Sequence, residues 1–96
     1  MKHFLSVDLG ATSGRTVLAS YADGRVEMEE WTRFANPQLP RDGHLYWDLA
    51  HLHAEIVKAL TRTAAQNIPL TSIGIDTWGV DFACFGADGR PMGDPY

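Results

Sequence analysis

The sequence predicts an α/β fold in which one helix packs on a mixed β-sheet. Three short runs rich in apolar and β-branched residues, separated by turn residues, predict strands at residues 3–9, 16–21 and 26–34. Apolar residues at helical spacing then predict a helix that follows Asp48 and ends near residue 66. A fourth strand is predicted at residues 70–76, so the helix connects two strands as in other α/β domains.

Turn residues divide these elements. Ala-Asp-Gly-Arg occurs at residues 22–25 and again at residues 87–90, and Asp-Gly between apolar runs is typical of a hairpin. The first copy predicts that the third strand runs antiparallel to the second. The second copy predicts a further hairpin that begins with a strand at residues 82–85. Residues 36–43 contain two prolines and are predicted to form a loop, and Asp48 is predicted to cap the helix.

Composition excludes several classes of function. A formal net charge of -4 without a basic run argues against nucleic-acid or anionic-membrane partners. The hydrophobic fraction of 45% is that of a folded chain, and no segment resembles a signal peptide or a membrane span. The only cysteine, Cys84, cannot form an internal disulfide, which favours a reducing, cytoplasmic location. Composition indicates no oligomeric state.

The first polar motif follows the first strand. Asp8 lies near the end of an apolar run, where a buried carboxylate needs a hydrogen bond or a cation. The turn after it, residues 10–14, has a glycine at each end, which lets backbone N–H groups approach an anion. An acid for Mg²⁺ beside such a turn suits phosphoryl transfer, although the lysine of a P-loop is absent. The alternative is a polar hairpin turn in which Asp8 caps backbone amides.

The second polar motif interrupts the apolar run that ends at Ile75. Asp76, Trp78 and Asp81 fall between two predicted strands, and Gly79 leaves room for a ligand or another backbone. Carboxylates accept hydrogen bonds from sugar hydroxyls, and an aromatic plane covers the apolar face of a sugar ring. The alternative is that Trp78 packs in the core and Asp81 is an exposed turn acid.

Together the two motifs resemble the N-terminal domain of the FGGY carbohydrate kinases. The matching segments are Asp8-Leu9-Gly10-Ala11-Thr12-Ser13-Gly14-Arg15, Tyr46-Trp47-Asp48, and Ile73-Gly74-Ile75 with the elbow Asp76-Thr77-Trp78-Gly79-Val80-Asp81-Phe82. Many members carry glutamine with Met-His-Gly or Arg-Glu at this elbow, and the sequence here is similar to the branch that phosphorylates L-rhamnulose. The resemblance implies a ribonuclease-H-like ATPase domain of the actin and hexokinase type, of which residues 1–96 would be an incomplete, N-terminal part.

The resemblance also implies a role for each motif residue. ATP phosphates would lie against Ala11, Thr12, Ser13, Gly14 and Arg15, with Mg²⁺ near Asp8. The sugar would lie against Gly79 and also Trp78, Asp76 and Asp81. Asp76 or Asp81 could reach a hydroxyl as a base, but the family's general base is an aspartate from a segment after Tyr96. The 96-residue chain alone is therefore expected to be inactive.

Three functions remain open at this point. The first is a kinase that makes L-rhamnulose 1-phosphate, and the second is a kinase for L-fuculose, ribulose or xylulose. The third is a non-enzymatic, actin-like nucleotide-binding module. The other candidate residues are expected to be structural: His51 and His53 on different helix faces do not suit a zinc pair, and Cys84, Trp31 and Trp47 are expected to be packed.

Overall fold

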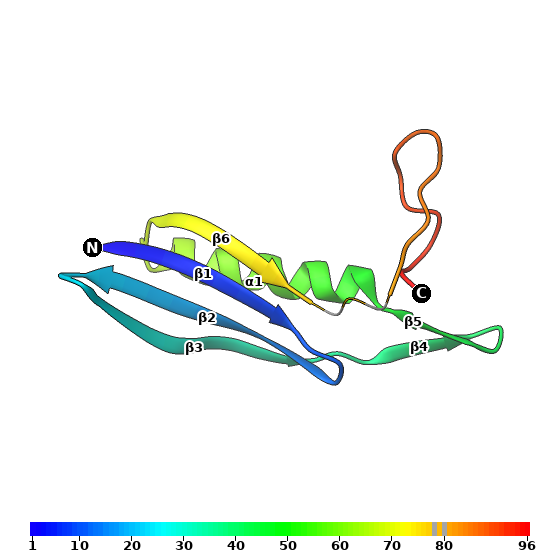
Figure 1. Cartoon of the computed structure of the whole chain (residues 1–96), viewed down its shortest axis with the longest axis horizontal. Helices are drawn as coiled ribbons and strands as arrows, with labels where there is room; N and C mark the ends of the chain where they lie inside the picture. Colours follow the sequence, from blue (N-terminus) through cyan, green and yellow to red (C-terminus); the bar gives the residue numbers. More distant parts are fainter. Residues whose placement is uncertain (78, 80) are drawn as a thin grey trace.

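A computed structural model describes residues 1–77, 79 and 81–96 of the chain. Its main sheet has the strand order β3-β2-β1-β6, and a separate two-stranded sheet contains β4 and β5 (Figure 1). The elements in chain order are β1 (Lys2–Leu9), β2 (Ser13–Ala22), β3 (Arg25–Ala35), β4 (Gln38–Arg41), β5 (His44–Trp47), α1 (Leu49–Ala65) and β6 (Leu70–Asp76).

The predicted mixed sheet is confirmed. β1, β2 and β3 are joined in antiparallel order, whereas β6 returns beside β1 in the parallel direction after α1. The turn between β2 and β3 places Asp23 and Gly24 at φ of 51° and 74°, a left-handed conformation that suits an Asp-Gly turn. The four strands predicted for this sheet are present, and β1, β2 and β3 extend beyond their predicted apolar runs, β1 by only one residue.

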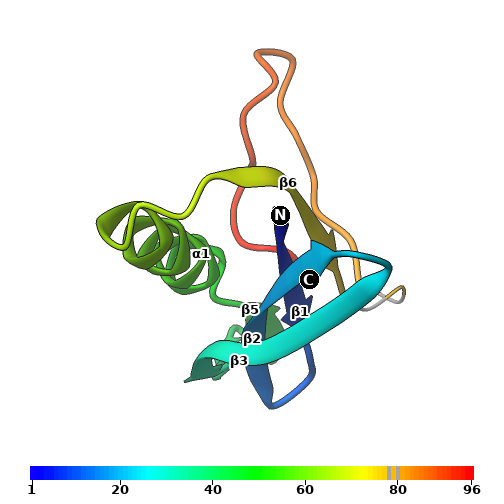
Figure 2. The ribbon, with the colours of Figure 1, turned by 90° about the vertical axis from the view of Figure 1, so that its left-hand side faces the viewer.

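The core lies between the sheet and α1, which covers one face (Figure 2). Alternation along β1 buries Leu5 and Val7 on this face, and Leu18 of β2 joins them. The predicted burial of Trp31 is confirmed, and its indole Nε1 donates to Thr63 Oγ1 of α1 at 3.1 Å. Ala59, which is fully buried, completes this cluster from the helix side.

The helix begins as predicted. The Asp48 carboxylate accepts a hydrogen bond from the backbone N–H of His51 at 3.1 Å, which satisfies one unpaired donor of the first turn. α1 ends at Ala65, and Asn67 adopts a φ of 55°, the left-handed conformation that asparagine tolerates after a helix. The predicted bounds of this element are therefore confirmed.

The loop predicted at residues 36–43 is wrong. β4 and β5 form a hairpin there, with Asp42 and Gly43 at φ of 50° and 77° in its turn. Asp-Gly is the same dipeptide that turns β2 into β3. Pro40 is tolerated because β4 is an edge strand, where no partner needs its missing N–H.

The strand predicted at residues 82–85 is also wrong. Among the described residues there, the only ladder contact is an isolated bridge between Phe85 and Pro91. The second Asp-Gly turn does form, because the N–H of Gly86 donates to the Arg90 carbonyl at 2.9 Å. The segment projects from the rest of the molecule with no neighbouring strand to pair with, and Cys84 is exposed in it, contrary to expectation (Figure 1).

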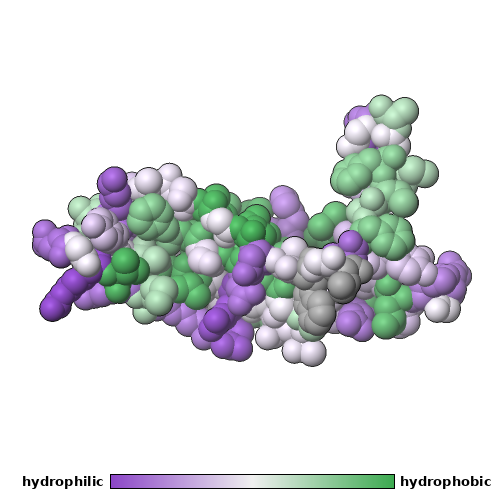
Figure 3. All heavy atoms as spheres, in the orientation of Figure 1, coloured by the Kyte–Doolittle hydropathy of each residue, from purple (hydrophilic) through white to green (hydrophobic). Residues whose placement is uncertain are grey.

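β6 is the most exposed strand of the main sheet. Its register places Ile73 beside Leu5 and Ile75 beside Val7, so both isoleucines lie on the face that α1 covers elsewhere. They nevertheless remain 43% and 57% exposed, and of β6 it is Leu70, at its start, that packs against the core cluster shared with the helix. Apolar surface is visible along the middle of the molecule and on the projecting segment (Figure 3). Within the described residues, no helix has the length and apolar character to cross a membrane.

Candidate functional site

The glycine-bounded turn joins β1 to β2. The N–H of Gly10 donates to the Ser13 carbonyl at 3.0 Å, which closes the turn around Ala11 and Thr12. A side chain at Gly10 would come within 2.8 Å of that carbonyl, so this position requires glycine. Thr12 is exposed at the tip, and within the described part of the chain neither the Ala11 nor the Thr12 N–H donates to another group. The turn can therefore offer backbone donors to an anion.

Asn36, directly after β3, supports this turn from beneath. Its backbone N–H donates to the Thr12 carbonyl at 3.0 Å, and its side-chain Nδ2 donates to the Gly10 carbonyl at 2.8 Å. Asn36 is only 4% exposed. Asn36 was not predicted as a site residue, because it falls in the loop predicted at residues 36–43. An asparagine directly after a predicted strand is the sequence signal that points to it.

Asp8 and Asp76 lie side by side at the ends of the parallel strands β1 and β6. Asp8 is on the sheet face opposite Val7, and its carboxylate is about half exposed (48%), not buried as its apolar strand suggested. A hydrogen bond in which protonated Asp76 donates to the Asp8 carboxylate, and then the negative charge of Asp8, raise the pKa of Asp76. Arg15 lies across from Asp8 on β2, with its Nε at 3.5 Å from Asp8 Oδ2.

A shallow hollow of about 200 Å³ opens beside these groups, and its walls are formed by Asp8, Leu9, Gly10, Asp76 and Thr77. The hydroxyl of Thr77 donates to the Leu9 carbonyl at 3.3 Å, which ties the end of β6 to the end of β1. One hollow is therefore bordered by Asp8, the predicted metal ligand, by Gly10, the first residue of the predicted phosphate turn, and by Asp76 and Thr77 of the elbow.

A second cavity, of about 160 Å³, lies on the other side of Leu9 and Thr77. Asp81, from the elbow, and Trp47, from the end of β5, contribute to its wall together with Asn36. Trp47 is only partly buried, so the expectation that it is a core residue is corrected: it borders this cavity. An indole beside a carboxylate is the combination predicted for Trp78, which falls outside the described residues.

Gly79 lies in open space. A side chain built at this position would meet no protein atom within 4 Å among the described residues, so no protein packing there requires glycine. His51 and His53 do not act together: the His51 Nε2 is 2.7 Å from the Ala35 carbonyl oxygen, whereas His53 borders a different hollow.

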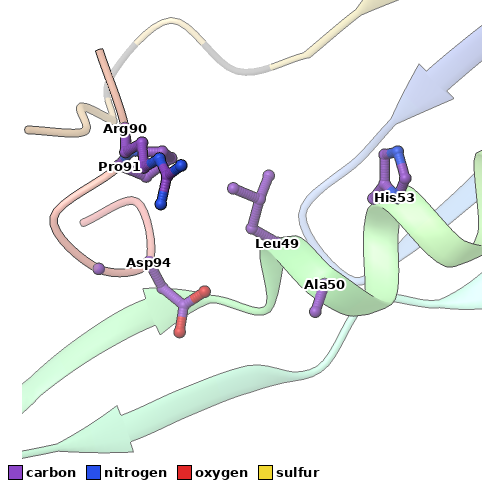
Figure 4. A pocket seen from close by; sticks show the side chains of 7 residues that line it. Leu49, Ala50, His53, Arg90, Pro91 and Asp94 are labelled. Atoms are coloured by element: carbon purple, nitrogen blue, oxygen red, sulfur yellow. The ribbon is translucent and has the colours of Figure 1, made fainter. Parts of the chain in front are cut away.

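A larger hollow lies elsewhere in the described part of the molecule. It has a volume of about 670 Å³ and lies between the start of α1, with Leu49 and His53, and the projecting segment, with Arg90 and Asp94 (Figure 4). None of the predicted site residues forms part of its wall. The carboxylate pair and the turn, not this larger hollow, therefore define the candidate site.

Comparison with known proteins gives one consistent group of relatives. The chain is 46% identical over 95 residues to a rhamnulokinase of Bacteroides thetaiotaomicron and 45% identical over 93 residues to one of Mannheimia succiniciproducens. A rhamnulokinase of Lactiplantibacillus plantarum is 40% identical over 95 residues. These matches cover 95–99% of this chain but only 19–20% of each relative. No protein-family model matches the chain.

The fold is similar to that of a solved sugar kinase. A ligand-bound xylulose kinase from Lactobacillus acidophilus superimposes with a TM-score of 0.75, over 99% of this chain and 19% of the other, at 15% sequence identity. The predicted ribonuclease-H-like fold is confirmed by this likeness, and the mixed sheet with a single helix is an incomplete form of it. The chain is therefore similar to rhamnulokinases over about a fifth of their length, and its fold is similar to that of part of a solved sugar kinase.

Proposed function

We propose that residues 1–96 are the N-terminal part of an ATP-dependent carbohydrate kinase that converts L-rhamnulose to L-rhamnulose 1-phosphate. One observation carries the proposal: Asp8 and Asp76 lie next to each other at the ends of β1 and β6, beside the glycine-bounded turn. The similarity to rhamnulokinases along almost the whole chain supports L-rhamnulose as the acceptor. We also propose a cytoplasmic location, because the enzyme would use ATP and because its only cysteine, Cys84, is free and exposed.

The turn would bind the ATP phosphates. Ala11 and Thr12 have backbone N–H groups without a partner among the described residues, and the hydroxyls of Thr12 and Ser13 lie in the same turn. Arg15 adds a positive charge at the start of β2. Phosphoryl transfer depends mainly on positioning and on neutralising charge, and these groups supply both.

Mg²⁺ suits the carboxylates of this site. Asp8 and Asp76 both present oxygen ligands, which Mg²⁺ prefers, and their half-exposed position leaves room for the waters that this ion retains. The hydrogen bond to Asp8 and then the negative charge of Asp8 raise the pKa of Asp76, and a cation would offset the effect of that charge. In the proposed enzyme, Asp8 would hold the hydrated ion, which would neutralise charge on the phosphates, and Asp76 lies beside Asp8 and could assist.

The sugar would bind on the elbow side. Asp81 can accept hydrogen bonds from sugar hydroxyls, and Trp47 can cover an apolar face, as was proposed for Trp78. Gly79 leaves open space for the ligand. The general base would come from a segment after Tyr96, so we infer that the 96-residue chain alone has no kinase activity.

Replacement of Asp8 in the complete protein tests the proposal. Asp8→Asn keeps the shape of the side chain but removes its charge, and kcat should fall by about 10²–10³-fold, as when other preorganised electrostatic groups are lost. Production of ADP with L-rhamnulose is the measurement. Asp23→Asn, in the exposed β2–β3 turn, is the matched control and should leave kcat unchanged. Undiminished activity of the Asp8→Asn protein would exclude the metal role.

Substrate identity needs a separate assay. The wild-type complete protein should have its highest kcat/KM for L-rhamnulose when L-fuculose, L-ribulose and D-xylulose are compared under the same conditions. A higher kcat/KM for another ketose would support the proposed kinase activity but would contradict L-rhamnulose as the preferred substrate. No turnover of any sugar, together with intact nucleotide binding, would favour the non-enzymatic module.

A further inference from the structure

We propose that Arg15 is the counter-charge of Asp8 in the nucleotide-free protein, and that it leaves Asp8 for the ATP phosphates when Asp8 binds Mg²⁺. This inference rests on the proposed function and adds an order of binding to it. Asp8 and Arg15 are directly opposite each other on β1 and β2, and Arg15 Nε lies 3.5 Å from Asp8 Oδ2. Both side chains are about half exposed, so ions from solvent can reach either of them.

The contact between Arg15 and Asp8 is weak. At 3.5 Å it is longer than an N–H···O hydrogen bond, and ion pairs between half-exposed side chains contribute little to stability. Arg33, opposite Arg15 on β3, is bound differently: its Nε and Nη2 donate to the two carboxylate oxygens of Glu30 at 2.6 and 3.0 Å. Arg33 is therefore held by a bidentate partner, whereas Arg15 can leave Asp8 at little cost.

Asp8 lies between two approaches. Asp76 of β6 is on one side of it and Arg15 of β2 is on the other, and the hollow of about 200 Å³ opens on the side of Asp76 and Gly10. A guanidinium beside the Asp8 carboxylate repels a second positive charge there. Asp8 therefore binds a divalent cation more tightly once Arg15 has moved away.

The triphosphate gives Arg15 a second partner. Arg15 directly follows the turn at residues 10–14, to which the proposed function assigns the phosphates, and a guanidinium pairs with phosphate oxygens as readily as with a carboxylate. When the cation arrives alone, Arg15 loses one ion pair and gains none. When it arrives with ATP, Arg15 exchanges one ion pair for another. The site should therefore prefer the metal–nucleotide complex to the free metal.

Arg15→Gln in the complete protein tests this exchange, because two ligands should respond in opposite directions. Mn²⁺, a paramagnetic probe that takes the same oxygen ligands as Mg²⁺, should bind the nucleotide-free variant about threefold more tightly than wild type, because a repelling charge is gone. The Mg²⁺ complex of a non-hydrolysable ATP analogue, measured by calorimetry, should bind about tenfold more weakly, because a charged phosphate contact is lost. Arg15→Lys keeps the charge and should return both affinities toward those of wild type.

Two controls define the source of these changes. Arg25→Gln removes the same charge at the other end of β3 and should alter neither affinity. Asp8→Asn removes the carboxylate for which Arg15 and the metal compete, so adding Arg15→Gln to it should not tighten Mn²⁺ binding further. A threefold gain that persists without Asp8 would overturn the inference, because the gain would then come from net charge alone.

The direction of each change separates this role from others. Unchanged Mn²⁺ affinity in Arg15→Gln would overturn the inference, because Arg15 would then not compete with the metal. Tighter binding of both ligands would also overturn it, because Arg15 would then not move to the phosphates. A merely structural residue would lower the number of binding sites with the folded fraction, measured by thermal unfolding, without opposite changes in affinity. If Arg15→Gln does not fold, Arg15→Met, which keeps much of the length without the charge, should show the same opposite changes.

Failure of the inference can be separated from failure of the proposed function. Wild-type protein that binds the ATP analogue and phosphorylates L-rhamnulose, while Arg15→Gln keeps the wild-type affinity for Mn²⁺, would reject the exchange alone. Wild-type protein that does not bind the analogue and is inactive with every ketose tested would reject the proposed function, and the exchange with it.

Discussion

Gly14 is enclosed by an aromatic ring. A β-carbon at this position would overlap the ring of Phe34, which is itself 7% exposed and packs edge-on against His51 with ring centroids 6.0 Å apart. Gly14 therefore lets β2 pass close to the end of β3 beside the phosphate turn. Its place in the motif has a packing reason as well as the proposed role in phosphate binding.

Replacement of Gly14 by alanine should destabilise the chain. The methyl group must displace the Phe34 ring, and overpacking of this kind costs about 1–3 kcal/mol. Urea denaturation would measure the difference in the free energy of unfolding. Gly74→Ala is the matched control, because a side chain there would meet nothing within 4 Å. Equal stability of the Gly14→Ala and wild-type proteins would show that the ring moves without cost.

The carboxylate pair gives the stability a specific pH dependence. Asp8 raises the pKa of Asp76 above its ordinary value of 3.8, so the folded chain holds this proton more tightly than the unfolded chain does. That contribution to stability is complete below pH 3.8 and is lost as the pH rises through the raised pKa. In Asp76→Asn, stability should therefore fall less over this interval, as measured by denaturation at a series of pH values. An unchanged pH profile would show that the two carboxylates do not interact.

At the scale of elements, α1 is joined to the sheet through β3. Trp31 lies where the pairing of β2 and β3 shifts register, so its indole reaches the helix and donates to Thr63. Thr63 Oγ1 in turn donates to the Ala59 carbonyl at 2.8 Å, and the guanidinium of Arg62 lies 3.8 Å from the centre of an indole ring. The helix is therefore positioned by a small polar network within an apolar interface.

Loss of the indole N–H tests this network. Trp31→Phe keeps an aromatic ring but removes the donor to Thr63, and the lost hydrogen bond should cost about 0.5–1.5 kcal/mol beyond the change in packing. A double-mutant cycle with Thr63→Val isolates this interaction energy. Thr61→Val is the matched helix control, because the Thr61 hydroxyl is exposed and bonds only to the Val57 carbonyl. A coupling energy near zero would contradict the network.

Sequence patterns correctly predicted the elements that are specified by a few consecutive residues. They failed for elements whose formation depends on contacts with distant parts of the chain. The strands of the main sheet and the Asp48 cap were readable because each pattern is complete within a few residues. The β4–β5 hairpin was missed because two prolines outweighed the Asp42-Gly43 turn. The strand at residues 82–85 was predicted because its residues are apolar, yet a strand also needs a partner, which the described chain does not supply.

The candidate site shows the same division. Asp8 with its turn, and the elbow, were each identified from the sequence because each motif is a short contiguous segment. The contact between Asp8 and Asp76 could not be derived from either motif, because it depends on the parallel register of β1 and β6. The contribution of Asn36 was equally inaccessible, since it joins residues 26 positions apart.

For the molecule as a whole, one face of the main sheet is only partly covered. Ile73 and Ile75 continue the apolar surface of Leu5 and Val7, but they remain 43% and 57% exposed. β6 is also an edge of the sheet in the described chain, and exposed edges of this kind pair readily with further strands. Because the chain spans a fifth of its relatives' length, we expect further segments of a longer protein to cover this face.

Replacement of Ile75 by alanine should therefore have different effects in two contexts. In the 96-residue chain, where Ile75 is 57% exposed, the free energy of unfolding should change by about 0.5 kcal/mol or less. In the complete protein the same substitution should cost about 2–5 kcal/mol, because a covered isoleucine leaves a cavity when it is shortened. Val57→Ala is the control, since Val57 lies on the exposed side of α1 and should respond weakly in both. Equal, small changes in the free energy of unfolding for Ile75→Ala in the two proteins would show that this face of β6 stays open to solvent. The candidate site would then lie on an edge strand that no further segment covers.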